Sequence, residues 1–551
     1  MLAPAAFAVQ FDVTRFDDPV PDGCNSGVDC SLREAIETAN ATPGGDVVNA
    51  PAPPAGQNYE LETGQLTILD NLTLTGGGAS TTTIDANALG RVIQIGESGR
   101  APEVEINGVT ITGGSARTGG GIRLFLGQLV LRHSVAAGNQ AFDETQNGQG
   151  GGLMVEPEST AFVENTTFRN NTARKFAGEG GVGGAIWNEG TLGLHKSTIG
   201  PGNTAEGGGG PSESGAEPGL GAGVGNSSGV VSIFNSTVSG NAIAGDLSGQ
   251  GGGVYTNLSG HVTIANSTLA ENAVRSPEGA GGNVATAFGG TVSIDHTLLA
   301  GGSAASGRTC SGSVTSEGHN LESPTSECGL NSGLFDQGAV ANPLLGPLAD
   351  NDGETQTHAL LEGSPAVDAG GTTCPPPETD QRGLVRAQGS ACDIGAFELQ
   401  QGPNLADPVG PDPDICDGRT ATIVGDKGDD VLMGTPGDDV IVSRTGNDQV
   451  LGLAGDDVIC TRGTADVLKG GSGDDVLRSD GGEDTLRGGG GNDKLHGANE
   501  ADDLAGGGGN DRVHGGGGND DLDGGAGDDE CFGNGGDHDQ GRRCERESSI
   551  P

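Results

Sequence analysis

The sequence predicts an all-β protein made of two successive arrays of short repeats. Glycine accounts for 107 of the 551 residues and aromatic residues for only 3%, which suits repeats with a thin aliphatic core better than one large globular core. A unit of about 30 residues recurs between residues 59 and 304, and a unit of nine residues recurs without a gap from residue 425 to 532. We therefore expect two or three domains, of which the two main ones are solenoids.

The nine-residue array contains 12 units, of which the first reads GDKGDDVLM and the eighth GGGGNDKLH. The sixth residue is Asp in every unit: Asp430, Asp439, Asp448, Asp457, Asp466, Asp475, Asp484, Asp493, Asp502, Asp511, Asp520 and Asp529. The fourth residue is Gly in ten units: Gly428, Gly437, Gly446, Gly455, Gly473, Gly482, Gly491, Gly509, Gly518 and Gly527. Thr464 and Glu500 replace it in units five and nine, and the eighth residue is aliphatic in 11 units. A disordered acidic linker would not keep this phase.

These residue types suit a calcium site. Glycine permits tight turns with positive φ, which bring backbone carbonyls and a carboxylate towards one point. Calcium takes about six to eight oxygen ligands of this kind. The units resemble the hemolysin-type (RTX) nonapeptide G-G-x-G-x-D-x-U-x, and this resemblance implies a calcium-bound parallel β-roll whose metal ligands are the Asp and Gly residues named above.

The resemblance also implies that two units make one turn, with calcium between loops on the same side of successive turns. Twelve units then form two stacks of six loops, with about ten sites between loops. Thr464 and Glu500 both fall in the odd-numbered stack, so we expect that stack to bind calcium less well.

The acidic charge of the array also favours a calcium-binding function. The array holds 25 Asp and Glu against eight Lys and Arg, in a chain with a formal net charge of −48. Without cations such a density should expand the chain by self-repulsion. The acidity argues against nucleic acid or an anionic membrane as a partner. No run of 18 apolar residues is present, so we expect no membrane span.

The N-terminus and the cysteines favour export from the cell. Residues 1–8 end in an A-x-A pattern (Ala6, Phe7, Ala8), as at a secretory cleavage site, and we expect a remnant of a signal peptide. The ten cysteines include no C-x-x-C pair, so zinc is not expected. Disulfides and millimolar calcium both belong outside the cytosol, and we expect an extracellular, secreted or surface-associated protein. Pairing of nearest neighbours is our hypothesis: Cys24–Cys30, Cys310–Cys328, Cys374–Cys392, Cys416–Cys460 and Cys531–Cys544.

Residues 9–50 should form an N-terminal cap. Ser31 and Glu34 make a capping box, and Leu32, Ala35 and Ile36 begin one apolar face of a helix that should end before the Pro-Gly pair at residues 43–44. One amphipathic helix ahead of a β-rich chain suits a lid over an open hydrophobic end. The segment resembles the CSLREA motif at the start of many bacterial surface proteins, which implies structural capping.

Residues 51–340 should form the first solenoid. Each repeat has a glycine cluster, an apolar pair, a turn, a strand and then an asparagine, which falls 18 or 19 residues after the glycine. Asparagines in phase can hydrogen-bond along a stack. The returning asparagines are Asn139, Asn171, Asn203, Asn241 and Asn272. The repeats resemble right-handed parallel β-helix proteins, and GGAIW with FRNN resembles the repeats of polymorphic outer-membrane adhesins.

The rest of the chain divides into four segments. Residues 341–400 resemble the "choice-of-anchor" segment that closes many CSLREA-type β-helices, residues 401–420 are a Pro-rich acidic linker, residues 421–532 are the RTX roll, and residues 533–551 are a tail. That tail is shorter than type I export of RTX proteins requires, so we expect Sec-type export. The anchor-like segment contains a cluster of charged residues: Asp368, Asp380, Arg382, Asp393 and Glu398. The cluster could be a functional site or, as we favour, could hold the final rung of the solenoid in place.

Two functions fit this organisation. We favour a calcium-binding protein whose β-helix binds a glycan, matrix or cell-surface partner. The alternative is a polysaccharide lyase, hydrolase or epimerase, because parallel β-helices often carry these enzymes. The sequence has one Trp and two Tyr and shows no recognisable catalytic motif, so we assign no catalytic residue and lean against an enzyme.

Overall fold

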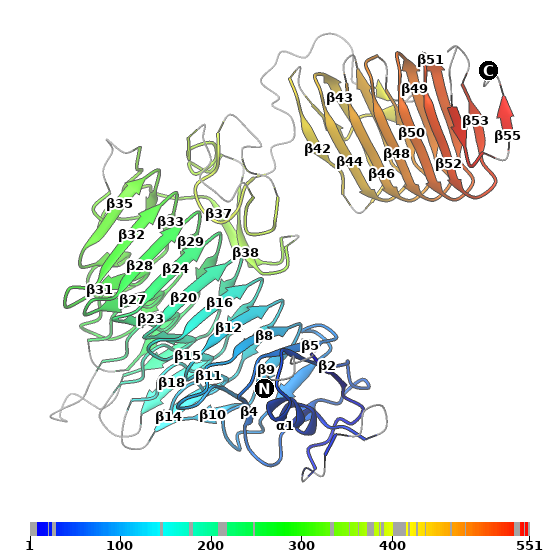
Figure 1. The fold of residues 1–551 in the computed structure, drawn as a ribbon. Helices are drawn as coiled ribbons and strands as arrows, with labels where there is room; N and C mark the ends of the chain where they lie inside the picture. Colours follow the sequence, from blue (N-terminus) through cyan, green and yellow to red (C-terminus); the bar gives the residue numbers. More distant parts are fainter. Residues whose placement is uncertain are drawn as a thin grey trace, which may run out of the picture. The chain divides into compact units, whose positions relative to one another are not determined.

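A computed structural model divides the chain into two compact units, residues 1–399 and 400–551 (Figure 1). It describes all residues except 1–7, 20, 22, 25–28, 144–146, 176–179, 208–217, 246–247, 331–334, 352, 362, 372–378, 385, 387–390, 400–414, 417–418, 426–427, 436, 463–464, 480, 534–539, 545 and 549–551. The expected signal remnant and linker lie almost wholly outside the described residues, as does Cys374.

The first unit is a solenoid of four parallel sheets (Figure 1). An 11-stranded sheet contains, in order, β1 (Gln10–Asp12), β2 (Asp46–Ala50), β5 (Leu72–Gly76), β8 (Glu103–Asn107), β12 (Gln128–Arg132), β16 (Thr160–Glu164), β20 (Thr191–His195), β24 (Val230–Phe234), β28 (His261–Ala265), β32 (Thr291–Asp295) and β35 (Val314–Gly318). A ten-stranded sheet contains β3 (Tyr59–Glu60), β6 (Thr83–Asp85), β9 (Thr110–Thr112), β13 (Val135–Ala137), β17 (Thr167–Arg169), β21 (Thr198–Ile199), β25 (Thr237–Ser239), β29 (Thr268–Ala270), β33 (Leu298–Ala300) and β36 (Leu321–Ser323).

The other two sheets complete each turn. A nine-stranded sheet contains β34 (Cys310–Ser311), β31 (Val284–Thr286), β27 (Val254–Asn257), β23 (Val224–Ser227), β19 (Ile186–Asn188), β15 (Leu153–Val155), β11 (Ile122–Leu124), β7 (Ile93–Ile95) and β4 (Leu66–Ile68). A six-stranded sheet contains β10 (Ser115–Ala116), β14 (Gln140–Asp143), β18 (Thr172–Lys175), β22 (Thr204–Glu206), β26 (Ala242–Ala244) and β30 (Ala273–Val274). Alternate residues of the strands point inwards and fill one continuous aliphatic core.

The predicted asparagines form a buried column between successive rungs. Each Nδ2 donates to Oδ1 of the next asparagine over 2.9–3.1 Å, from Asn139 through Asn171, Asn203, Asn241 and Asn272 to Asn283. Nδ2 also donates its second hydrogen to a backbone carbonyl, as Asn203 does to the carbonyl of Phe168. These donors therefore satisfy polar groups that the turns would otherwise leave unpaired in the core.

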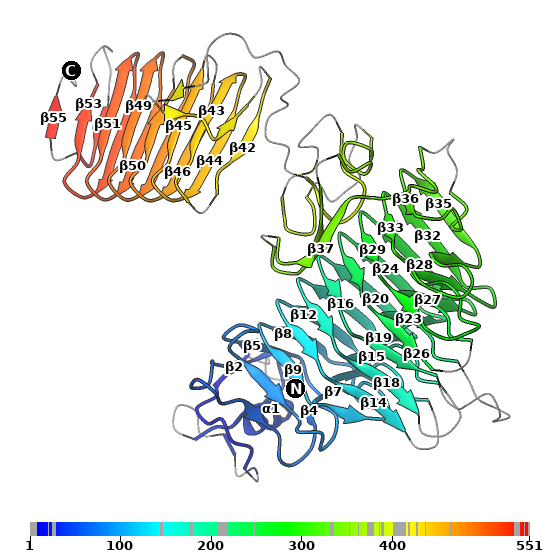
Figure 2. The same cartoon turned by 180° about the vertical axis from the view of Figure 1, so that it is seen from behind.

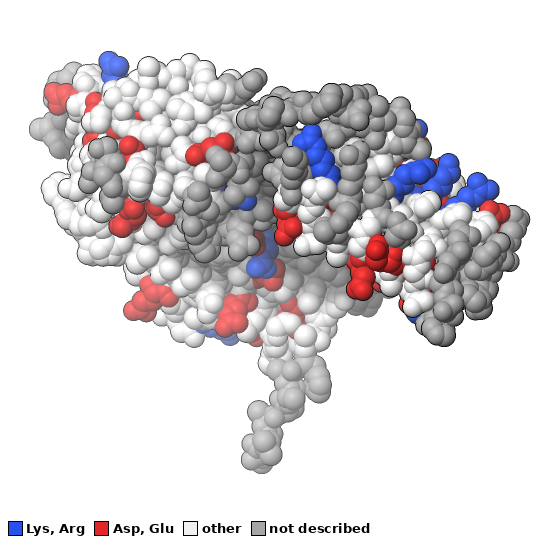
Figure 3. Space-filling view, turned by 90° about the horizontal axis from the view of Figure 1, so that it is seen from above, with Lys and Arg blue, Asp and Glu red and all other residues white. Residues whose placement is uncertain are grey.

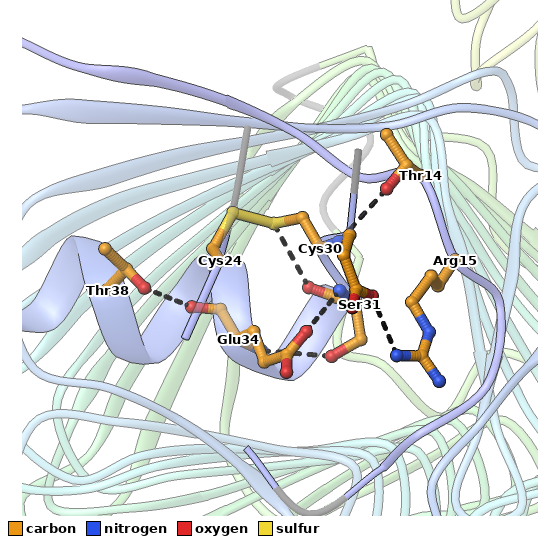
Figure 4. The surroundings of a disulfide bond; sticks show 8 residues. Thr14, Arg15, Cys24, Cys30, Ser31, Glu34 and Thr38 are labelled. Atoms are coloured by element: carbon orange, nitrogen blue, oxygen red, sulfur yellow. Dashed lines mark hydrogen bonds and ion pairs between the residues drawn. A yellow bond between two sulfur atoms is a disulfide. The ribbon is translucent and has the colours of Figure 1, made fainter. Parts of the chain in front are cut away.

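The one helix found in the described ranges, α1 (Leu32–Ala41), packs against β2 and β4 at the start of the solenoid. The predicted capping box is present: the backbone N–H of Glu34 donates to the Ser31 hydroxyl, and the Glu34 carboxylate accepts from the Ser31 N–H (Figure 4). The predicted apolar face is buried. The disulfide Cys24–Cys30 lies directly before the cap.

The described residues between 335 and 399, which we call the return segment, pack along the side of the solenoid (Figure 2). The segment contains one antiparallel pair, β37 (Leu345–Ala349) with β38 (Thr357–Leu360). It is held by hydrogen bonds to successive rungs, among them Thr198 to the carbonyl of Gln356 (2.6 Å), Thr237 to Gln381 (2.7 Å) and Ser239 to His358 (2.8 Å).

The second unit is a β-roll of two parallel sheets (Figure 1). One has eight strands: β41 (Ile423–Val424), β43 (Val440–Thr445), β45 (Val458–Arg462), β47 (Val476–Arg478), β49 (Lys494–Asn499), β51 (Arg512–Gly517), β53 (Glu530–Phe532) and β55 (Arg546–Ser548). The other has seven: β42 (Val431–Met433), β44 (Gln449–Ala454), β46 (Val467–Ser472), β48 (Thr485–Gly490), β50 (Asp503–Gly508), β52 (Asp521–Ala526) and β54 (Gln540–Arg542). A short antiparallel hairpin, β39 (Ile415–Cys416) with β40 (Arg419–Thr420), precedes them.

The position-eight side chains, from Ile441 to Cys531, form the buried core of this roll. The predicted fold class is therefore confirmed: an all-β chain with a parallel β-helix, one short capping helix and a C-terminal parallel β-roll.

Candidate metal centre

The 12 position-six aspartates lie in two columns, and each directly precedes a strand of the roll. Even-numbered units lead into the eight-stranded sheet and odd-numbered units into the seven-stranded sheet. The backbone N–H of each aspartate from Asp430 to Asp511 donates to Oδ1 of the aspartate 18 residues later, over 2.8–3.0 Å. This bond is present at all ten steps from Asp430 to Asp529.

The second carboxylate oxygen is the informative one. In six aspartates Oδ2 is buried and has no hydrogen-bond partner among the described residues: Asp448, Asp457, Asp475, Asp493, Asp502 and Asp511. A buried, unpaired carboxylate oxygen is costly unless it meets a proton or a cation. The columns therefore present the type of oxygen that a hard cation such as calcium prefers.

Burial also shifts the acidity of these groups. It raises the pKa of Asp475 and Asp502 to about 7. It raises the pKa of Asp457, Asp466 and Asp493 to about 6. Neighbouring carboxylates raise these pKa values further, whereas backbone N–H donors lower them. A bound cation would relieve both burial and like-charge repulsion in the ionised columns.

Glycine at position one leaves the space around Oδ2. A Cβ on Gly506 would lie 2.4 Å from Oδ2 of Asp511, and one on Gly470 would lie 2.2 Å from Oδ2 of Asp475. Nine of the 12 units carry glycine here. The regular glycine at position one is visible in the sequence, but its role in leaving space beside Oδ2 was not predicted.

The position-four glycines lie where successive turns approach each other. Eight of the ten have positive φ, from +107° at Gly455 to +155° at Gly527, whereas Gly428 and Gly437 are not in this set. A Cβ on Gly473 would lie only 2.1 Å from the carbonyl oxygen of Gly455. Glu500 adopts φ +69°, a conformation in which a side chain is strained, and Thr464 lies outside the described residues.

The side chains at position five form a second, solvent-exposed ladder of hydrogen bonds. This ladder differs between the even and odd stacks. In the even stack an Asp or Asn side chain accepts from the backbone N–H of the next turn at all five steps, from Asp438 to Asp528. In the odd stack one such bond is found among the described residues, from Asn447 to Asp429. Ala465 and Ala501 interrupt that column because they have no acceptor.

One concavity of the roll lies on the even stack. It has a volume of about 240 Å³ and is lined by Asn492, Asp493, Lys494, Asn510, Asp511, Arg512, Asp528 and Glu530. Among the described residues, no three His, Cys, Asp or Glu side chains converge as a conventional metal cluster. Eleven of the 12 units instead offer one buried position-six carboxylate together with backbone carbonyls, which is a donor set for calcium rather than for zinc.

The charged cluster of the return segment is structural. Arg386 is buried and donates to Oδ1 of Asn235 (2.9 Å) and the carbonyl of Gly395 (2.8 Å). Arg382 pairs with buried Asp380 at 2.8 Å. These contacts fasten the segment along the side of several rungs, whereas our preferred hypothesis placed them at the final rung. The difference arises because the segment turns back over the corner between two sheets.

One cavity of about 410 Å³ lies between the return segment and the solenoid. Its lining includes one carboxylate, Glu271, beside His358 and Asn342, and it contains no Lys or Arg. Acidic side chains lie as separate spots on the largely neutral face of the first unit drawn in Figure 3. In the described part of the chain, no helix has the length and apolar character of a membrane span.

Comparison with known proteins supports the repeat array. Residues 424–459, 462–495 and 496–537 match the family model of the RTX calcium-binding nonapeptide repeat, whose members typically bind Ca²⁺. These stretches confirm the predicted RTX repeats. No curated protein matches the chain in sequence.

Among solved structures, the pectate lyase Pel9A is similar at 13% identity and a TM-score of 0.39, over 72% of this chain and 97% of that one. An alginate lyase from Paenibacillus sp. strain FPU-7 is similar at 15% identity and a TM-score of 0.24, over 52% and 96%. At these values neither enzyme's activity carries over to this chain.

Proposed function

We propose that this chain is a secreted or cell-surface calcium-binding protein whose C-terminal roll is ordered by calcium. The observation that carries the proposal is the pair of aspartate columns, in which Oδ1 joins successive turns and, in the six aspartates named above, Oδ2 is buried without a hydrogen-bond partner among the described residues. Cations would turn the electrostatic cost of these columns into folding free energy.

The proposed ligand set consists of the 12 position-six aspartates and the backbone around the ten position-four glycines. Position-one glycines provide room for the ion and are not ligands themselves. The residues supply binding and orientation only, and no chemical step is assigned to the ions.

Location outside the cell is part of the proposal. Four disulfides in the described residues support it: Cys24–Cys30, Cys310–Cys328, Cys416–Cys460 and Cys531–Cys544. The CSLREA-type cap, the anchor-like return segment and the division into cap, β-helix, linker, roll and tail belong to the same proposal.

For the β-helix we propose adhesion, through a glycan or another cell-surface partner. The support is the contrast between a constant framework and variable loops: the asparagine column repeats in phase, while the stretch from each asparagine to the next glycine cluster varies from 12 to 20 residues. Variable loops on a rigid stack are a common way to present a binding surface. The described lining of the cavity beside Glu271 has no Lys or Arg to neutralise a sugar carboxylate and does not favour a lyase.

Two experiments test the proposal on the full chain. Far-UV circular dichroism during calcium titration should show a reversible gain of β signal that a chelator removes. A flat titration, with no heat of calcium binding in calorimetry, would contradict the proposed calcium function. A glycan array and a cell-binding assay with calcium-loaded protein test the β-helix, and blank results in both would count against adhesion.

A further inference from the structure

The two halves of the roll have different outer faces on the eight-stranded sheet. In units two and four of the first half, three outward-facing valines are buried: Val440 is 8%, Val442 0% and Val458 1% exposed. At equivalent positions in the second half, Lys494 and Arg512 are exposed. The first half therefore has a second apolar layer that the second half lacks.

The hairpin of β39 and β40 covers this second layer. Cys416 in β39 is 1% exposed and packs with Val440, Val442 and Val458 in one apolar cluster on the outside of the sheet. Its disulfide to Cys460 in β45 fastens the hairpin over the first turns of the roll. A cross-link of this kind restricts the unfolded chain and so favours the folded state independently of any metal.

The net charge also differs between the two halves of the roll. Units one to six, residues 425–478, contain 11 Asp and Glu against five Lys and Arg, a balance of −6. Units seven to 12, residues 479–532, contain 14 against three, a balance of −11. The second half thus carries more repulsion and has less apolar burial to oppose it.

We propose that units one to six, fastened by Cys416–Cys460, fold without calcium and serve as a template on which calcium orders units seven to 12. This inference rests on the proposed calcium function and specifies where that function acts. Calcium would then add turns to an existing stack, which avoids the cost of forming the first turns.

Hydrogen–deuterium exchange of the oxidised full chain tests this division. In chelator, amides of β43 and β45 should stay protected, whereas amides of β49, β51 and β53 should exchange at least about tenfold faster than in calcium. Equal exchange of β45 and β51 in chelator would overturn the template. An absence of any calcium response along the roll would instead overturn the proposed calcium function.

A matched pair of variants tests the role of the disulfide. Cys416→Ser with Cys460→Ser should remove the protection of β45 in chelator and raise the calcium concentration at half-saturation several-fold. Cys531→Ser with Cys544→Ser, at the other end of the roll, should leave β45 protected. If both pairs shift the calcium midpoint equally, or if β45 remains protected after loss of Cys416–Cys460, the template role of that disulfide is wrong. Recovery of the full β signal at saturating calcium shows that each variant can still fold.

Discussion

The backbone N–H of Asp493 donates to Oδ1 of Asp511 over 2.8 Å, while Oδ2 of Asp511 is buried and meets no hydrogen-bond partner in the described part of the roll. One oxygen of the carboxylate therefore fixes the register between two turns, and the other is left for a cation. Because the same arrangement repeats every 18 residues, binding at one step organises the ligands of the next. Cooperative calcium binding is the expected result.

Asp511→Asn should raise the calcium concentration at half-saturation about tenfold, because it keeps an acceptor for Asp493 but removes the charge. The matched control is Asp466→Asn in the odd stack, where the position-five ladder is interrupted by Ala465. Its effect should be smaller. Calorimetric titration of both variants measures the difference, and equal losses would contradict the inequality of the two stacks.

Gly506→Ala should weaken calcium binding, because its Cβ would lie 2.4 Å from Oδ2 of Asp511. Gly508→Ala, two residues away, is the control, since the nearest atom to its Cβ is 4.0 Å distant. We expect a loss of several-fold in calcium affinity for the first variant and little change for the second. Similar affinities would show that position one does not shape the site.

Asn203→Ala should destabilise the β-helix by about 3 kcal/mol, because it removes the acceptor for the buried Nδ2 of Asn171 and the donor to the buried Oδ1 of Asn241. Thr191→Ala, at an exposed strand position, is the control. The fluorescence of Trp187, the single Trp of the chain, reports on the first unit alone. Thermal unfolding followed at Trp187 should show a lower Tm for the first variant only, and unchanged midpoints would refute the contribution of the column.

Asp393 should make the return segment sensitive to pH. Burial, with the nearby Glu398 carboxylate, raises the pKa of Asp393 to about 7. A raised folded-state pKa means that the protonated form favours the fold: this stability is full below the unfolded pKa of about 4 and is lost as pH rises through about 7.

We therefore expect the Tm of the first unit to fall between pH 5 and pH 8 more steeply in the parent than in Asp393→Asn. Measurements at constant calcium isolate this effect from the roll. A constant difference in Tm between the two proteins at every pH would show that Asp393 does not titrate in this range.

Most of the predictions that the structure confirms depended on the spacing of residues close together in the sequence or repeated at a fixed interval. The Ser31 and Glu34 capping box and the asparagine column depend on fixed separations along the chain, and the structure confirms both. The aspartate phase is equally visible. The division of each β-branched run into two strands was not predicted: residues 261–269 turn at Asn266, with φ +49°, and enter a second sheet. Alternating apolar residues continue across this turn, so pattern alone does not reveal it.

Contacts between distant segments could not be predicted. Gln381 hydrogen bonds Thr198 and Thr237, which lie 183 and 144 residues away, and no repeat links these positions. Likewise, the sequence indicated which aspartates recur but not that Oδ1 of ten of them would accept a hydrogen bond from the preceding turn. That assignment requires the register of the stacked turns.

The return segment contacts Thr198, Thr237, Thr268 and His296 on four consecutive rungs. A solenoid whose rungs touch only their neighbours can gain or lose a repeat by duplication or deletion. Here the spacing of the groups on the return segment matches a fixed number of rungs, so deleting one repeat in this stretch would misalign every later contact. The segment thus sets the length of this part of the solenoid, while rungs outside its span remain free to vary in number.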